Sequence, residues 1–158
     1  AGASTVILIG TREERLELGR RLGADITINI NKENAFDEIL RITHGRGVDV
    51  GIEASGSIQA LADTLKVTRK QGRVLVFGIY SENARLDMQD MHRRELTIFG
   101  SSGCPWSMPT SINLIAKNKI EVKPMITHSV NLEEFEILFN DGIFEHRKEG
   151  YFKGVLLM

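Results

Sequence analysis

The segment VILIGTREERLELGRRLGAD, residues 6–25, decides the class of fold. It opens with a run of large apolar residues, as a strand buried on both faces does, and the run ends at Gly10. A polar helix rich in Arg and Glu follows without a linker and closes at Gly23. A strand, a tight turn and a helix in this order form the repeating unit of parallel, nucleotide-binding sheets. No glycine-rich turn of the kind that binds a pyrophosphate precedes this unit in the sequence.

Strand and helix patterns alternate through the rest of the first hundred residues. Apolar, β-branched runs predict strands, and the more polar segments between them predict helices. The predicted strands are 5–10, 26–30, 48–53, 73–79 and 95–100, and the predicted helices are 12–22, 34–44 and 57–69. This alternation predicts an α/β fold, a Rossmann-type parallel sheet with helices on both faces.

The pattern changes after Gly100. The later predicted elements are a helix at 110–118, extended chain at 122–128, a helix from a capping box at Asn131 and Glu134 to Phe139, and a strand at 151–158. We therefore expect two parts. Residues 1–103 would form a partial dinucleotide-binding domain, and residues 104–158 a C-terminal α+β segment.

Composition excludes several classes of partner. The chain has 158 residues with 20 basic and 21 acidic side chains, a formal charge of -1, so neither nucleic acid nor an anionic membrane surface is favoured. A single cysteine permits a reducing compartment. No apolar run approaches the ~20 residues of a membrane span, and no signal peptide is visible. We expect a cytoplasmic protein that binds a small molecule.

Several segments in this order resemble the medium-chain dehydrogenase/reductase superfamily, in its zinc-dependent alcohol and polyol dehydrogenase branch. They are VILIGTREERLELGRRLGAD at 6–25, GVDVGIEASG at 47–56, QGRVLVFGIY at 71–80, RRELTIFGSSG at 93–103 and VKPMITHSVNLEEFE at 122–136. The resemblance covers essentially the whole chain and implies the C-terminal half of such an enzyme, without its first strand, glycine-rich turn and N-terminal catalytic domain. In the strand order 3-2-1-4-5-6, the absent strand would lie between residues 5–10 and 48–53.

The resemblance implies a parent enzyme that transfers a hydride between a secondary alcohol or polyol and a nicotinamide cofactor. A zinc-free quinone or enoyl reductase of the same superfamily is one alternative. A non-catalytic module that senses a dinucleotide is the other. We expect this chain alone to be inactive.

The turn after the first predicted strand bears on the choice of cofactor. Where an NAD-specific fold carries Asp or Glu to bind the adenosine ribose, this chain has Gly10. Thr11, Arg12 and Arg15 offer a hydroxyl and two guanidinium groups to a 2′-phosphate. We therefore expect NADP, with NAD as the alternative. Thr11 and Glu14 also have the spacing of a capping box, so a structural turn with solvated arginines is the competing interpretation.

The resemblance implies further cofactor contacts at the carboxyl ends of later strands. Ala54, Ser55 and Ile58 would border the adenine, and the backbone at Phe77, Gly78, Ile79 and Phe99 would approach the nicotinamide. Plain core packing is the alternative for the three apolar side chains in the second group. We interpret Glu53 as an exposed carboxylate at a strand end, without a catalytic role.

No metal site is expected in this chain. Its Cys and His residues are scattered, without the close spacing that a zinc site needs: Cys104, His44, His92, His128 and His146. The resemblance implies that the catalytic zinc and the proton-relay residues belong to the N-terminal domain. It also implies a homodimer or homotetramer, because the family strand that corresponds to 95–100 pairs with its symmetry mate. Pairing would protect an open edge that carries Leu96, Ile98 and Phe99.

Overall fold

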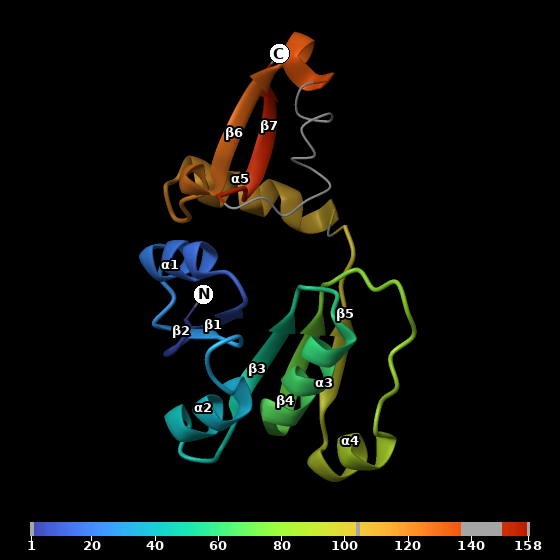
Figure 1. Ribbon diagram of the computed structural model, residues 1–158. Helices are drawn as coiled ribbons and strands as arrows, with labels where there is room; N and C mark the ends of the chain where they lie inside the picture. The colour runs from blue at the N-terminus through green and yellow to red at the C-terminus, as the bar shows by residue number, and fades with distance from the viewer. Residues whose placement is uncertain (1, 104, 137–149, 158) are drawn as a thin grey trace. The chain divides into compact units, whose positions relative to one another are not determined.

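The computed structural model describes residues 2–103, 105–136 and 150–157. They form two compact units (Figure 1). The first unit comprises Ala1–Asn31 and Ser107–Met158, and the second comprises Lys32–Trp106. The division into domains at 103 and 104 stays a prediction.

The first unit begins with the predicted strand, helix and strand. β1 (Ile7–Gly10) pairs in parallel with β2 (Ile26–Asn29), and α1 (Glu13–Arg21) connects them. Leu16 and Leu18 of α1 are buried, as is Ile28 of β2. The helix packs closely on β1 at Gly19, where a Cβ atom would lie 2.0 Å from the side chain of Leu8. Leu16 also lies beside Gly10, where a Cβ atom would be 3.3 Å from its side chain, so the contacts of Leu16 and Gly19 with β1 hold α1 against the strand.

The later part of the first unit contains a second parallel pair of strands. After the short η1 (Pro105–Ser107), the elements are α5 (Met108–Ala116), η2 (Lys123–Met125), β6 (Ile126–Asn131), η3 (Leu132–Glu134) and β7 (Lys153–Leu157), with β6 paired to β7. The predicted capping box is confirmed, because Asn131 N donates to Glu134 Oε2 at 3.4 Å and the reciprocal bond is present. The expected extended segment 122–128 instead begins with the 3-10 turn of η2. Phe139, the expected end of this helix, lies outside the described residues.

The second unit is a three-stranded parallel sheet with helices between its strands. Its elements are α2 (Ala35–Ile42), β3 (Val48–Glu53), α3 (Ile58–Val67), β4 (Thr68–Val76), α4 (Met88–Arg94) and β5 (Thr97–Gly100). The sheet order is β3-β4-β5, which confirms the predicted parallel α/β class and the predicted order of these strands. Among the described residues, no strand pairs with the other edge of β1 or of β3. Those are the two edges between which the sequence predicts a missing strand.

Two elements of this unit differ from expectation. β4 starts at Thr68, directly after α3, and ends at Val76, so Phe77–Ile79 lie in the loop beyond the strand. The sequence prediction missed α4, since its residues MQDMHRR present no apolar face and none of them is buried. The available signal was Asp87, whose side chain caps α4 by accepting from Asp90 N at 2.9 Å.

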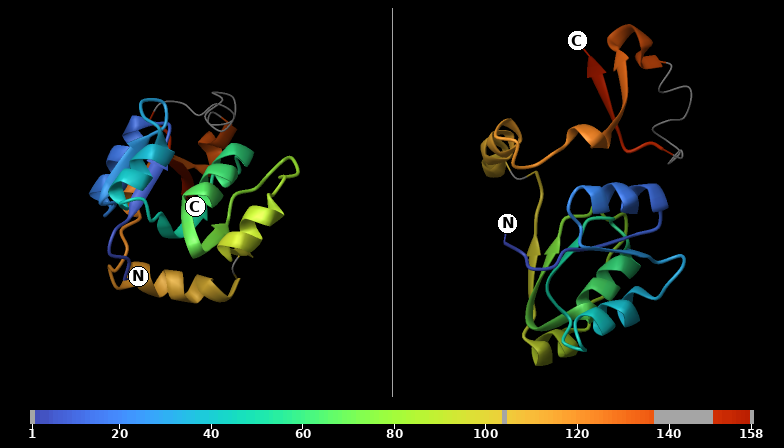
Figure 2. Two further views of the ribbon diagram at one scale, coloured as in Figure 1. Left: turned by 90° about the horizontal axis from the view of Figure 1, so that it is seen from below. Right: turned by 90° about the vertical axis from the view of Figure 1, so that its left-hand side faces the viewer.

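α3 covers one face of this sheet, as the right-hand view of Figure 2 shows. Leu61 and Leu65 of α3 form a buried cluster with Val74 of β4, and Tyr80 packs against it. Alternate residues of β3 point the other way, and Ile52 is 63% exposed. The carboxyl ends of β3, β4 and β5 meet at one edge of the sheet, where open α/β folds bind their ligands.

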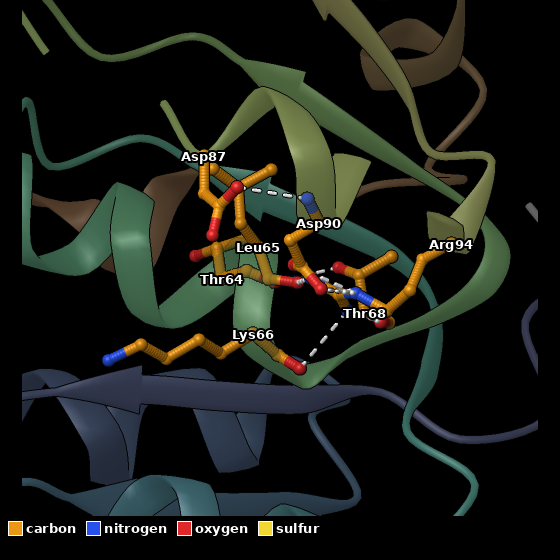
Figure 3. A network of polar contacts seen from close by, with 7 residues as sticks. All are labelled: Thr64, Leu65, Lys66, Thr68, Asp87, Asp90 and Arg94. Carbon is orange, nitrogen blue, oxygen red and sulfur yellow. Dashed lines mark hydrogen bonds and ion pairs between the residues drawn. The ribbon is translucent and has the colours of Figure 1, made fainter. Parts of the chain in front are cut away.

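Arg94, the last residue of α4, closes the end of α3 (Figure 3). Its guanidinium donates to the carbonyl oxygens of Leu65 at 2.9 Å and Thr68 at 2.7 Å, and it forms an ion pair with Asp90. Carbonyl groups in the last turn of a helix have no partner within the helix, so Arg94 satisfies groups that would otherwise need water. The hydrogen bonds from Arg94 hold the pKa of Asp90 below its ordinary value.

In the described part of the chain, the helices are too short or too polar to span a membrane.

Candidate functional site

The turn between β1 and α1 places an arginine where the helix begins. Arg12 is the N-cap residue of α1, and its side chain makes no capping hydrogen bond. This side chain is 21% exposed, with its Nε 4.0 Å from Glu14 Oε1. Its Nη1 is buried and has no hydrogen-bond partner among the described residues. Because a buried nitrogen of a charged group is unfavourable without an acceptor, the turn presents a cation that an anionic ligand would complete.

The capping box predicted at this turn is wrong. Thr11 lies one residue before the N-cap, and α1 begins one residue later than the spacing of Thr11 and Glu14 requires. The carbonyl oxygen of Thr11 accepts a hydrogen bond from Asn31 Nδ2 at 3.0 Å. The hydroxyl group of Thr11 therefore has no capping role in α1.

Arg15, one turn further along α1, is held by the C-terminal part of the same unit. Its Nη2 donates to the carbonyl oxygen of Tyr151 at 3.2 Å, and its guanidinium lies 5.4 Å from the centre of the Phe152 ring. A guanidinium over an aromatic face is attracted by the ring. The competing interpretation of solvated arginines therefore does not describe Arg12, whereas Arg15 is exposed and makes these two contacts at the surface.

Two asparagines support the turn, Asn29 at the end of β2 and Asn31 just after it, and sequence reasoning missed them. Asn29 is buried at the end of β2, and its Nδ2 donates to Glu13 Oε2 at 3.0 Å. Asn31 reaches Thr11 as described above. Parallel neighbouring strands end at the same edge, so the position of these residues just after an apolar run was the available signal.

Glu53 is the centre of a second cluster, at the end of β3 in the second unit. It is 2% exposed, so its interpretation as an exposed carboxylate is wrong. Its Oε1 accepts from the backbone N and the hydroxyl of Ser55, at 2.7 and 2.5 Å, and from Gly56 N at 3.2 Å. Its Oε2 accepts from the hydroxyl of Tyr80. A buried carboxylate is tolerated here because several donors surround it.

Two glycines let the loops after β3 and β4 touch. Gly56 has a φ of +76°, and a Cβ atom there would lie 2.2 Å from the carbonyl oxygen of Ile79. A Cβ atom at Gly78 would lie 2.3 Å from Gly56 N and 2.5 Å from Glu53 Oε2. The backbone oxygen of Glu53 also accepts from Phe77 N at 2.8 Å and Gly78 N at 3.0 Å. Backbone and side chain of Glu53 thus fasten both loops.

The pKa values of this cluster follow from burial and hydrogen bonding. Burial acts to raise the pKa of Glu53, but the hydrogen bonds from Ser55, Tyr80 and Gly56 outweigh it and hold this pKa below its ordinary value. Burial, together with the hydrogen bond to Glu53, raises the pKa of the Tyr80 hydroxyl. Glu53 is therefore ionised and Tyr80 neutral near neutral pH.

Comparison with known proteins identifies the family. The profile of the zinc-binding dehydrogenases matches residues 1–117. The chain belongs to the zinc-binding dehydrogenase family. This match confirms the resemblance seen in the sequence.

Individual relatives agree with this assignment. The chain is 34% identical over 139 residues to D-arabitol-phosphate dehydrogenase of Enterococcus avium. This alignment covers 85% of this chain and 40% of that protein. It is 35% identical over 141 residues to L-threonine 3-dehydrogenase of Bacillus subtilis strain 168, covering 86% and 40%. A Sinorhizobium meliloti 1021 protein classed as a zinc-binding dehydrogenase, solved bound to NADP, superposes with a TM-score of 0.89 at 26% identity, covering 100% of this chain and 46% of that one. The chain thus spans less than half the length of these relatives.

As a zinc-binding dehydrogenase, the chain carries its expected cofactor contacts in two places. Gly10, Thr11, Arg12 and Arg15 lie in the first unit at the β1–α1 turn, whereas Ala54, Ser55, Ile58, Phe77, Gly78, Ile79 and Phe99 lie in the second. Within the second unit, the structure brings Ala54–Gly56 beside Phe77–Ile79 through Glu53. The contacts of all these residues with a cofactor stay predictions.

The apolar members of the second group are not core residues. Phe77 is 52% exposed, Ile79 is 95% exposed and Phe99 is 48% exposed, which excludes the core-packing alternative for them. Exposed aromatic and aliphatic groups at the carboxyl edge of a parallel sheet are suited to contact a flat ring.

No group of three or more potential metal ligands occurs in the described residues of this zinc-binding dehydrogenase chain. His128 is half-buried, its Nδ1 lies 2.9 Å from the hydroxyl oxygen of Thr127, and its ring lies 5.3 Å from that of Tyr151. Cys104 and His146 lie outside the described residues.

Proposed function

We propose that this chain is the NADP-binding portion of a dehydrogenase that transfers a hydride between a secondary alcohol or polyol and nicotinamide. Arg12 carries the proposal, because its buried Nη1 lacks an acceptor beside Gly10, where an NAD-specific enzyme carries a carboxylate. A 2′-phosphate would supply that acceptor. Similar structures have been solved with NADP, from Sinorhizobium meliloti 1021, and with NADH, from E. coli CFT073, so the choice between the two cofactors rests on the β1–α1 turn.

In this proposal, each group of expected contacts is assigned to one part of the cofactor. Arg12, Arg15 and the Thr11 hydroxyl bind the 2′-phosphate, and the absence of a side chain at Gly10 leaves space for it. Ala54, Ser55 and Ile58 border the adenine. Phe77–Ile79 and Phe99 orient the nicotinamide and shield it from water. NADP, when bound, supplies the carbon that accepts a hydride from the carbinol carbon of the substrate.

The substrate class rests on the relatives named above, whose substrates are a polyol phosphate and a hydroxy amino acid. Among the described residues no group of three or more potential metal ligands is present, and we propose that the N-terminal domain of the natural protein holds the catalytic zinc. We also propose a cytoplasmic location, no activity for this chain alone, and a homodimer or homotetramer paired through residues 95–100. The edge position of β5 in its sheet supports this pairing.

Fluorescence titration of the natural full-length protein with NADPH and with NADH tests the choice of cofactor. The Arg12→Ala variant should raise the dissociation constant of NADPH about tenfold or more and leave that of NADH nearly unchanged, since an ion-paired hydrogen bond to phosphate is lost. Arg21→Ala removes the same charge from the exposed last turn of α1 and serves as the control. A marked preference for NADH that Arg12→Ala does not alter would contradict the proposal.

A substitution at Gly10 provides the reciprocal test. Gly10→Asp should shift preference toward NADH, because its carboxylate repels a 2′-phosphate and can bind ribose hydroxyls. A Cβ atom there would lie 3.3 Å from the side chain of Leu16, so Gly10→Ala is the matched control for this crowding. If Gly10→Asp and Gly10→Ala change the affinities for NADPH and NADH by the same amounts, crowding by the added Cβ atom, and not the charge, is responsible.

A further inference from the structure

Glu53 is a buried carboxylate for which the proposed hydride transfer has no use. It stands at the end of β3, is almost fully buried, and is surrounded by donors from both neighbouring loops. A buried charge is costly unless it is fully hydrogen-bonded, so an amide or an apolar residue would serve packing alone more simply. What this carboxylate achieves is the joining of two loops.

One loop leads from β3 to α3 and the other leaves β4. The carboxylate of Glu53 accepts from Ser55 and Gly56 in the first loop and from Tyr80 in the second. Its backbone oxygen accepts from Phe77 N and Gly78 N. Glu53 therefore bonds to Ser55 among the expected adenine contacts and to Phe77 and Gly78 among the expected nicotinamide contacts.

Tyr80 ties this arrangement to the core of the unit. Its ring packs against the cluster of Leu61, Leu65 and Val74, and its hydroxyl reaches Glu53 Oε2. The carboxylate is thereby positioned relative to α3 and β4, and not only relative to the loops. A group fixed by packing and hydrogen bonds can hold the ligand contacts around it to a single geometry.

We propose that Glu53 and Tyr80 form a positioning pair that holds the loops 54–57 and 77–79 in the geometry required to bind the nicotinamide cofactor. The inference rests on the proposed dinucleotide binding and goes beyond it, because neither residue needs to touch the cofactor. Both are positioning residues. Loss of either one loosens the adenine-side and nicotinamide-side contacts together.

A double-mutant cycle on NADPH binding by the natural full-length protein tests the pair. Tyr80→Phe keeps the packed ring and removes only the hydroxyl, and Glu53→Gln keeps the size of the side chain but removes its charge. Each should raise the dissociation constant of NADPH about tenfold, the effect of one hydrogen bond to a charged group. The double variant should bind only slightly more weakly than either single variant, since both act through the same contact.

Asp87→Ala is the control for a merely structural effect. Asp87 caps α4 through the bond to Asp90 N, and α4 lies at the end of the sheet opposite the strand tips (Figure 1). This variant should lower the melting temperature and leave the dissociation constant of NADPH within about twofold, because its effect is confined to a helix end. Circular dichroism confirms that each variant is folded at the titration temperature.

The possible outcomes separate the two proposals. If the wild type binds NADPH while both single variants bind it within twofold of the wild type, the positioning pair is disproved and the proposed function stands. Additive effects in the double variant would also disprove it. If the wild type binds neither NADPH nor NADH, the proposed function fails and this inference fails with it.

Discussion

The β1–α1 turn and the loops at the ends of β3 and β4 satisfy their polar groups in opposite ways. In the turn, Arg12 Nη1 is buried without an acceptor among the described residues. At the ends of β3 and β4, the carboxylate of Glu53 is surrounded by protein donors. Under the proposed function, a ligand would supply the missing acceptor in the turn, whereas the protein itself supplies the donors around Glu53. Substitutions in the turn should weaken binding more than folding, whereas substitutions around Glu53 should weaken both.

The largest effect is expected from Gly56→Ala. The added Cβ atom would lie 2.2 Å from the backbone oxygen of Ile79, so the loops after β3 and β4 must separate. The backbone of Gly56 also has a φ of +76°, which strains any residue with a Cβ atom. We expect a loss of about 3 to 5 kcal/mol in the free energy of unfolding, from strain and overpacking together. Urea denaturation measures it.

Gly45→Ala separates these two causes. Gly45 has a φ of +79° but nothing within 4 Å of an added Cβ atom. Gly45→Ala should lower the free energy of unfolding by only about 1 to 2 kcal/mol, because a residue with a Cβ atom is strained in the left-handed region. Equal losses in the two variants would show that the close contact of the loops contributes little.

An intermediate effect is expected from acid. The pKa of Glu53 is lower in the folded chain than its ordinary value of 4.5, so its ionised form stabilises the fold above that pH. This stabilisation should disappear as the pH falls below 4.5 and through the folded-state pKa. The difference in unfolding free energy between the wild type and Glu53→Gln should therefore shrink as the pH is lowered from 6 to below 4.5. A difference that does not vary with pH would mean that the carboxylate is not held in its charged form.

The smallest effect is expected at Thr11. Because Thr11 does not cap α1, Thr11→Ala should change the unfolding free energy by less than about 0.5 kcal/mol. Ser57 does cap its helix, since its hydroxyl accepts from Ala60 N at 3.3 Å, and Ser57→Ala should cost about 1 kcal/mol. Thermal melts of the two variants provide the comparison. A loss of unfolding free energy in Thr11→Ala as large as in Ser57→Ala would show that Thr11 does cap α1, and would contradict this prediction.

Local signals in the sequence were sufficient for the parallel α/β fold. The strands predicted at 5–10 and 26–30 and the helix predicted at 12–22 agree within two residues with β1, β2 and α1. α4 was missed because a short, polar helix has no apolar periodicity to detect.

The environment of Glu53 could not be read from its neighbours in the sequence. Its partner Tyr80 is 27 residues away and meets it only because β3 and β4 are paired in parallel. The N-cap of α1 was misplaced for a different reason. Capping depends on the residue at which the backbone becomes helical, and the spacing of Thr11 and Glu14 does not determine that residue.

The contacts of Arg94 have a consequence for how the second unit opens. Its guanidinium binds carbonyl oxygens at the end of α3, and the residue after it, Glu95, turns the chain toward β5 in a left-handed conformation with φ of 52°. The last turn of α3 therefore cannot fray without releasing α4. Amide hydrogens in these two segments should exchange with solvent through one shared opening, with similar protection, as a single cooperative unit of unfolding.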